Sequence, residues 1–113
     1  MAKGKIVLLP FPFDDFSALK VRPAVCLTDP IDPHRHIVVA FITSQIPTTV
    51  LDSDLVLRVD HSDFARTGLR VDSTFRLHRL ITVTASLIKR ELGDLAPSLQ
   101  SEVSARLQRL FAL

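Results

Sequence analysis

The sequence lacks the features that mark secreted and membrane-spanning proteins. Its 113 residues include one cysteine, no tryptophan and no tyrosine. A single cysteine cannot form an intrachain disulfide, which fits a reducing cytoplasm, and Cys26 is expected to be a buried, unreactive thiol because it lies in an apolar stretch. No stretch approaches the roughly 20 apolar residues of a transmembrane helix. The first apolar run stops at Pro10, so we expect neither a membrane span nor a signal peptide.

Length and hydrophobic content indicate one folded domain, residues 1–113, because 47% of the residues are hydrophobic. A chain this short buries a modest fraction of its surface, so oligomerisation would add stability. The net charge of +2 does not by itself indicate a nucleic-acid-binding protein. The charges are uneven, however: residues 64–90 carry six basic residues and one acid, whereas residues 45–63 carry four acids and one arginine. This division is compatible with binding a polyanion on one face, although an ordinary solvated surface explains it more simply.

Short apolar segments between turn residues predict a mainly β structure. The expected strands are residues 6–9, 21–27, 36–42, 55–59 and 72–83. The third of these is almost continuously apolar and β-branched, which predicts a strand buried on both faces. In the last one the apolar alternation breaks at Arg79, which predicts a bulge or a strand end there.

One helix is expected at the C-terminus, because apolar residues recur there at helical spacing. The stripe consists of Leu99, Val103, Leu107, Leu110 and Phe111. Pro97 suits the first turn of this helix, and Glu102 lies near its positive end. Short helical turns are expected within 61–69, stopped by Gly68, and within 85–90. Five or more strands and one C-terminal helix predict a small antiparallel sheet or barrel with the helix packed on it.

Residues 5–27, KIVLLPFPFDDFSALKVRPAVCL, resemble the opening of the MazF/PemK family of bacterial toxins. Members open with a glycine and a strand, continue with Pro-Phe-Pro-Phe and a polar loop, and then have Lys-Val-Arg-Pro-Ala. Gly4, Pro10 to Phe13 and Lys20 to Ala24 match in that order. The resemblance continues through residues 37–47, 73–83 and 87–95 and is weak at 48–72. It implies an SH3-like antiparallel barrel with one long C-terminal helix, usually in a homodimer.

The resemblance also implies the toxin component of a type II toxin–antitoxin system that cuts single-stranded RNA sequence-selectively and without a metal. The family's active-site arginine falls on Arg22, and the threonine that ends its third strand falls on Thr43. Arg22 would stabilise the phosphorane and deliver the leaving-group proton, because a guanidinium donates bidentately to phosphate. Thr43 would donate to the phosphate. Without the resemblance, an ion pair of Arg22 with Asp14 or Asp15 and an ordinary strand-end hydroxyl would be the simpler interpretations.

The general base is less clearly marked in the sequence. Some members carry Arg-x-Asp on the late strand, whereas this sequence has Arg76-Leu77-His78. Histidine can accept a proton near neutral pH, so His78 is the candidate base, and an exposed histidine without a catalytic role is an equal alternative. The remaining RNA contacts are expected from Phe13, Lys20, Ser44, Ser73, Arg76 and Arg79. Phe13 would stack on a base or pack in the core.

We expect no metal and no cofactor. The candidate site has no cluster of carboxylates to hold magnesium, and the histidines beside Asp29 and Asp32, His34 and His36, are weak evidence for a metal site. The expected partners are single-stranded RNA, a cognate antitoxin with a disordered acidic tail, and a second copy of the chain.

Two other functions stay open at this stage. The gyrase poison CcdB shares the fold superfamily and is not a nuclease, but it depends on a tryptophan-containing tail that this sequence lacks. An inactive SH3-like binding module is the second alternative, because His78 departs from the Arg-x-Asp pattern of some members.

Overall fold

The computed structural model describes residues 2–10 and 20–113 as a mainly β structure with one C-terminal helix. The elements are β1 (Lys5–Pro10), β2 (Val21–Cys26), β3 (His36–Thr43), β4 (Asp54–Leu57), η1 (Ala65–Thr67), β5 (Ser73–Thr84), η2 (Ala85–Leu87), β6 (Arg90–Asp94) and α1 (Pro97–Leu110). The strands form one antiparallel sheet in the order β4-β5-β3-β2-β1-β6. The predicted fold class is therefore confirmed.

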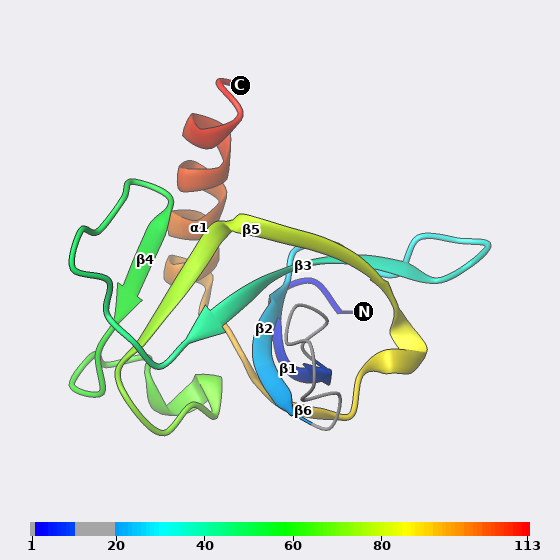
Figure 1. Cartoon of the computed structure of the whole chain (residues 1–113), viewed down its shortest axis with the longest axis horizontal. Coiled ribbons are helices and arrows are strands. Elements are labelled where there is room, and N and C mark those ends of the chain that lie inside the picture. Colours follow the sequence, from blue (N-terminus) through cyan, green and yellow to red (C-terminus); the bar gives the residue numbers. More distant parts are fainter. Residues whose placement is uncertain (1, 11–19) are drawn as a thin grey trace.

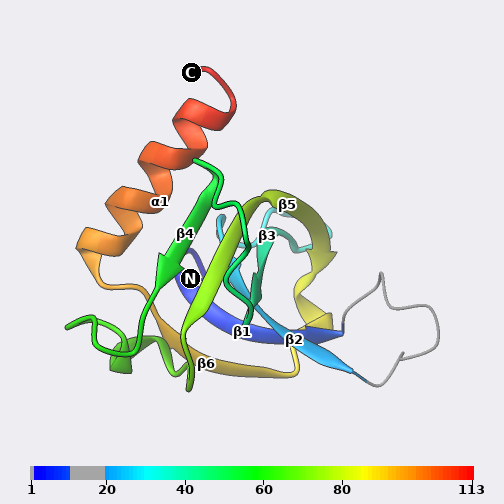
Figure 2. The same cartoon turned by 60° about the vertical axis from the view of Figure 1, so that its left-hand side comes forward.

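The sheet is curled, and α1 lies beside β4 and β5 at one end of it (Figures 1 and 2). The bend in β5 accounts for much of this shape. Ala40 of β3 pairs with Leu80, but Ile42 pairs with Phe75, so residues 76–79 of β5 face a single residue of β3. Extra residues on one strand bend it and increase its twist. The irregularity predicted near Arg79 is thus confirmed.

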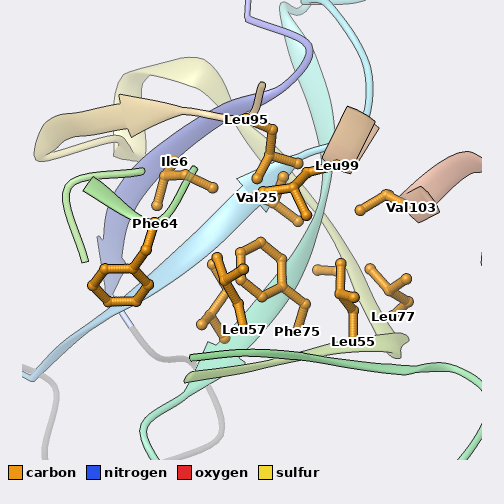
Figure 3. Close-up of a cluster of buried hydrophobic side chains, with 12 residues drawn as sticks. Ile6, Val25, Leu55, Leu57, Phe64, Phe75, Leu77, Leu95, Leu99 and Val103 are labelled. Carbon is orange, nitrogen blue, oxygen red and sulfur yellow. The ribbon is translucent and has the colours of Figure 1, made fainter. Parts of the chain in front are cut away.

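Alternation along the strands divides the buried side chains into two clusters, one on each face of the sheet. The first cluster joins the sheet to α1 and includes Phe75, Leu77, Leu55, Leu99 and Val103, as Figure 3 shows. The second cluster contains Val7, Leu9, Ala24, Cys26, Ile37, Val39 and Phe41. Because β3 supplies both clusters, it is buried on both faces, as predicted. Cys26 is buried as well, with 1% of its surface exposed.

The helical turns expected within 61–69 and 85–90 are confirmed as η1 and η2, with Gly68 following η1, but the apolar pattern did not predict β6, which begins at Arg90. The sequence Arg-Glu-Leu-Gly-Asp has no alternating apolar residues, so this strand is defined by its pairing with β1. The predicted strand 55–59 is also shifted: β4 begins at Asp54, and Val59 is 55% exposed.

The helix was predicted correctly, but only part of its apolar stripe is buried. Leu99 and Val103 are buried and Leu107 packs on the core, whereas Leu110 and Phe111 are 40% and 54% exposed. The C-terminal end of α1 extends beyond the sheet (Figure 1). No helix in the described part of the chain is long and apolar enough to cross a membrane.

Candidate functional site: an arginine-rich cavity at one edge of the sheet

Because neighbouring strands are antiparallel, the start of β2, the end of β3 and the start of β5 lie at the same end of the sheet. Ala24 of β2 pairs with Phe41 of β3, and Arg22 lies two residues before Ala24 while Thr43 lies two residues after Phe41, so both lie towards the same end of the sheet. On the other side of β3, Thr43 pairs with Thr74. Ser44 follows Thr43 in the sequence, and Ser73 precedes Thr74 at the start of β5. Three segments that are far apart in the sequence therefore present polar side chains together.

A cavity of about 740 Å³ opens at this end of the sheet. Its polar lining consists of Arg22, Thr43, Ser44, Gln45, Arg70, Ser73, Arg76, Arg79 and Arg90. The apolar lining includes Leu8, Val21, Phe41 and Leu92, from β1, β2, β3 and β6. We call this site the arginine cavity.

The arginine cavity concentrates positive charge far beyond the average of the chain. Five arginines line it, and none of its described lining residues is an aspartate or glutamate, although the whole chain has a net charge of only +2. Arginine stays protonated at any physiological pH and offers five donors in a planar fork. A concave surface of one charge sign attracts and concentrates ligands of the opposite sign. The cavity therefore suits a polyanion, and its hydroxyl groups add neutral donors.

Arg22 and Thr43 reach the arginine cavity from strand ends. Arg22 is held extended because Pro23 follows it, and its Nη1 lies 3.4 Å from the carbonyl oxygen of Val21. The Thr43 hydroxyl accepts the backbone N–H of Gln45 at 3.1 Å. This contact uses an acceptor site and leaves the hydroxyl proton free to be donated. The alternative ion pair of Arg22 involves Asp14 and Asp15, which lie outside the described residues.

Arg76 lies on β5 and lines the cavity, and its guanidinium also contacts two residues outside the cavity lining. Its Nε lies 2.6 Å from Oδ1 of Asp54, whose side chain is fully buried. Its Nη2 lies 3.5 Å from Nε2 of His78. The other ring nitrogen of His78, Nδ1, lies 3.0 Å from the hydroxyl oxygen of Ser53. His78 thus touches a cavity arginine but does not itself line the cavity.

The structure brings together six of the residues singled out from the sequence: Arg22, Thr43, Ser44, Ser73, Arg76 and Arg79. It does not bring in Lys20, which is exposed before β2 and absent from the lining, or His78. Phe13 lies outside the described residues. The roles assigned to these residues remain predictions.

Sequence reasoning missed Arg70 and Arg90 as site residues, and it missed Asp54 behind Arg76. Arg70 follows η1 and Arg90 begins β6. The only signal for these two arginines was the basic composition of residues 64–90. No motif marked Asp54.

The loop considered for a metal has other contacts. Asp29 accepts the backbone N–H groups of Ala2 and Lys3 at 2.8 and 2.9 Å. These hydrogen bonds, that of Lys3 first, lower the pKa of Asp29. The rings of His34 and His36 lie 5.6 Å apart. Within residues 2–10 and 20–113, no three His, Cys, Asp or Glu side chains are grouped to hold a metal ion.

Solved structures with the same fold include several toxins. The "Mycobacterium tuberculosis toxin MazF-mt6" is 20% identical, with a TM-score of 0.72 over 96% of this chain and 97% of that one. An "Endoribonuclease in complex with its cognate antitoxin from Mycobacterial species" is 12% identical, with a TM-score of 0.74 over 100% of this chain and 96% of that one. A further M. tuberculosis toxin is 22% identical, with a TM-score of 0.62 over 78% of this chain and 90% of that one.

At these identities the structures establish a common fold. A search of curated proteins found no match. The family assignment comes from the sequence itself, because residues 2–111 match the family described as "PemK-like, MazF-like toxin of type II toxin-antitoxin system". The chain therefore belongs to the PemK-like and MazF-like toxins of type II toxin–antitoxin systems, a family of endoribonucleases.

Proposed function

We propose that this toxin cuts single-stranded RNA in the arginine cavity, by attack of a ribose 2′-hydroxyl on the adjacent phosphorus. The observation that carries the proposal is the cavity itself: five arginines and three hydroxyl side chains surround about 740 Å³ without a carboxylate among the described lining residues. Guanidinium groups match phosphate geometry bidentately. A single strand can enter such a concave site with its backbone unpaired.

The residues of the cavity supply what this reaction needs. The 2′-oxygen gives its proton to a general base, for which His78 is the candidate, and bonds to phosphorus, and the bond from phosphorus to the 5′-oxygen breaks as that oxygen takes up a proton from Arg22. Arg22 would stabilise the charge of the crowded phosphorane and protonate the leaving oxygen, and Thr43 would donate to a phosphate oxygen. The nucleophile already lies beside the phosphorus, so proximity replaces a second bound reactant. The products would be a 2′,3′-cyclic phosphate and a free 5′-hydroxyl.

The remaining cavity residues would bind the RNA on either side of the cut. Six residues of the lining would contact phosphates and sugars of the RNA: Ser44, Ser73, Arg70, Arg76, Arg79 and Arg90. His78, whose Nε2 lies 3.5 Å from Nη2 of Arg76, is the candidate general base and would accept the proton of a ribose 2′-hydroxyl bound beside that arginine.

We also propose a cognate antitoxin and a homodimer. An acidic, disordered segment of the antitoxin could cover the arginine cavity, gaining charge-assisted hydrogen bonds as it folds on the surface. The similar endoribonuclease solved with its cognate antitoxin supports this partner class. The small size of the chain supports the dimer.

The test uses a long RNA to map cut sites, followed by an oligonucleotide that contains one site. We expect cleavage in excess EDTA, with 2′,3′-cyclic phosphate and 5′-hydroxyl ends. A matched oligonucleotide with a single 2′-deoxy sugar immediately 5′ of the scissile phosphate should bind but stay intact. Undiminished cleavage of the deoxy substrate, or a 5′-phosphate on the product, would exclude the mechanism. Absence of any cleavage would exclude the activity.

Variants of the two candidate catalytic residues test the site. Arg22→Ala and Thr43→Ala should each lose most cleavage and relieve growth inhibition while remaining folded. Arg109→Ala is the matched control, because Arg109 lies on α1 in an exposed ion pair with Asp52. If both cavity variants are folded and as active as the parent, the reaction takes place elsewhere.

A further inference from the structure

The buried carboxylate of Asp54 lies directly behind the arginine cavity. Asp54 begins β4 and pairs across the sheet with Arg76 of β5. Its side chain is fully buried, and Oδ1 lies 2.6 Å from Nε of Arg76, whose side chain is 26% exposed. A carboxylate is almost never fully buried unless a partner compensates its charge. Among the described residues, Arg76 makes the close ion pair with this carboxylate, and Nδ1 of His78 lies 3.9 Å from the same Oδ1.

The contact occupies one edge of the guanidinium. Nε lies 2.6 Å from Oδ1 of the buried carboxylate, in an ion pair in which neither of these two atoms has a hydrogen-bond partner, and Nη2 lies 3.5 Å from Nε2 of His78. The remaining N–H groups of the guanidinium are on the cavity side, where Arg76 is part of the lining. A planar group fixed along one edge has few remaining orientations, so its outer donors point in a defined direction before any ligand binds.

The segment that carries Asp54 is itself fixed on both sides. Oδ2 of Asp54 accepts the backbone N–H of Leu51 at 2.9 Å, and the backbone oxygen of Ser53 accepts the N–H of Leu77 at 2.9 Å. From α1, Nη1 of Arg106 donates to the backbone oxygens of Asp52 and Asp54 at 2.6 and 3.3 Å. The carboxylate therefore has a fixed position relative to both β5 and the helix.

We propose that Asp54 is a positioning residue, which acts through Arg76 by holding its guanidinium in the orientation that receives a phosphate of the RNA. The inference rests on the proposed function and extends it to a residue that touches neither the RNA nor the reacting atoms. Ser53 and His78 complete the support on the same side: the Ser53 hydroxyl meets Nδ1 of His78, and Nε2 of that ring faces Arg76.

The test compares Asp54→Asn with Asp52→Asn. Both substitutions remove one negative charge from the same segment, but Asp52 is 64% exposed and pairs with Arg109 on α1, away from the cavity. We expect Asp54→Asn to lower kcat about 100-fold, the size of effect that a misplacement of about 1 Å produces. Binding of the 2′-deoxy oligonucleotide should change by less than about 3-fold at unchanged stoichiometry, because four cavity arginines remain. Asp52→Asn should match the parent.

A double-mutant cycle with Arg76→Ala separates positioning from a general effect on the fold. If Asp54 acts through Arg76, adding Asp54→Asn to Arg76→Ala should change kcat by less than about 3-fold. A loss of the same factor in both backgrounds, or parent-like kcat in Asp54→Asn, would overturn the proposal. Circular dichroism at the assay temperature shows that each variant is folded.

One measurement does not depend on cleavage. The Nε–Hε cross-peak of Arg76 in a ¹⁵N spectrum can be identified by its loss in Arg76→Ala. Its chemical shifts should be the same in the parent and in Asp52→Asn, and they should change in Asp54→Asn, because that substitution removes the charge 2.6 Å from Nε. An unchanged cross-peak in Asp54→Asn would refute the positioning contact. If the parent does not cut RNA, this spectrum still decides whether Asp54 orders Arg76, so the two proposals can fail separately.

Discussion

The arginine cavity makes a quantitative prediction about the salt dependence of RNA binding. The perturbations are Arg70→Ala and Arg90→Ala, which remove cavity arginines that sequence reasoning did not select. Neither side chain has an ion pair among the described residues, and both are exposed. Their loss should therefore remove a phosphate contact without uncovering a buried carboxylate.

The magnitude follows from counterion release. For single strands, the logarithm of the binding constant falls with the logarithm of salt concentration with a slope of about −0.7 per neutralised phosphate. Five cavity arginines set an upper limit of about −3.5 for the parent, and each removed contact should bring the slope about 0.7 closer to zero. Between about 50 and 200 mM salt, a slope of −3.5 weakens binding about 100-fold, and one contact fewer reduces this to about 50-fold.

The assay is fluorescence anisotropy with the uncleavable 2′-deoxy oligonucleotide at four or more salt concentrations. Arg109→Ala is the control, because it removes the same charge from α1, outside the cavity, and should leave the slope unchanged. The reasoning is refuted if Arg70→Ala and Arg90→Ala keep the parent slope. It is equally refuted if Arg109→Ala flattens the slope as much as they do.

Three further predictions concern stability and reactivity. In thermal or urea unfolding, Leu99→Ala should cost about 2–5 kcal/mol because the side chain is buried against the sheet, whereas Leu110→Ala on the exposed end of α1 should cost less than about 1 kcal/mol. Gly68→Ala should lower the free energy of unfolding by more than about 1 kcal/mol, since Gly68 has φ 76 and a Cβ there would overlap the carbonyl oxygen of Leu92. Burial raises the pKa of the Cys26 thiol from 9.0 to about 11, so the folded state holds a proton that the unfolded chain loses first. That contribution to stability is complete below about pH 9 and should fall as pH rises towards 11, and a thiolate-directed reagent at pH 8 should label Cys26 only after denaturation.

Much of the fold could be predicted from local patterns. Period-two alternation and β-branched runs marked the strands around β1, β2, β3 and β5, and period 3.6 marked α1, because one face of each element must be buried. The apolar pattern missed β6, although the resemblance covered residues 87–95, since the residues of β6 pair with β1 through the backbone and carry little apolar signal of their own. The burial of the α1 stripe was overestimated for a related reason. Periodicity identifies the apolar face of a helix but not how far the neighbouring sheet extends along it.

The sequence by itself determined the family, through the motif around Arg22, and with it the expectation that Arg22 and Thr43 share a site. Local sequence could not assign Arg70, Arg90 or Asp54 to that site, because their significance depends on position in space. Arg70 and Arg90 belong to the cavity because β6 and the segment after η1 meet the edge formed by β2, β3 and β5. Asp54 is an acidic residue in an acidic stretch until cross-strand pairing buries it against Arg76. The net charge of a segment can be counted from its sequence. Whether one of its charges is exposed, paired or directed into a cavity depends on which distant strands pack together.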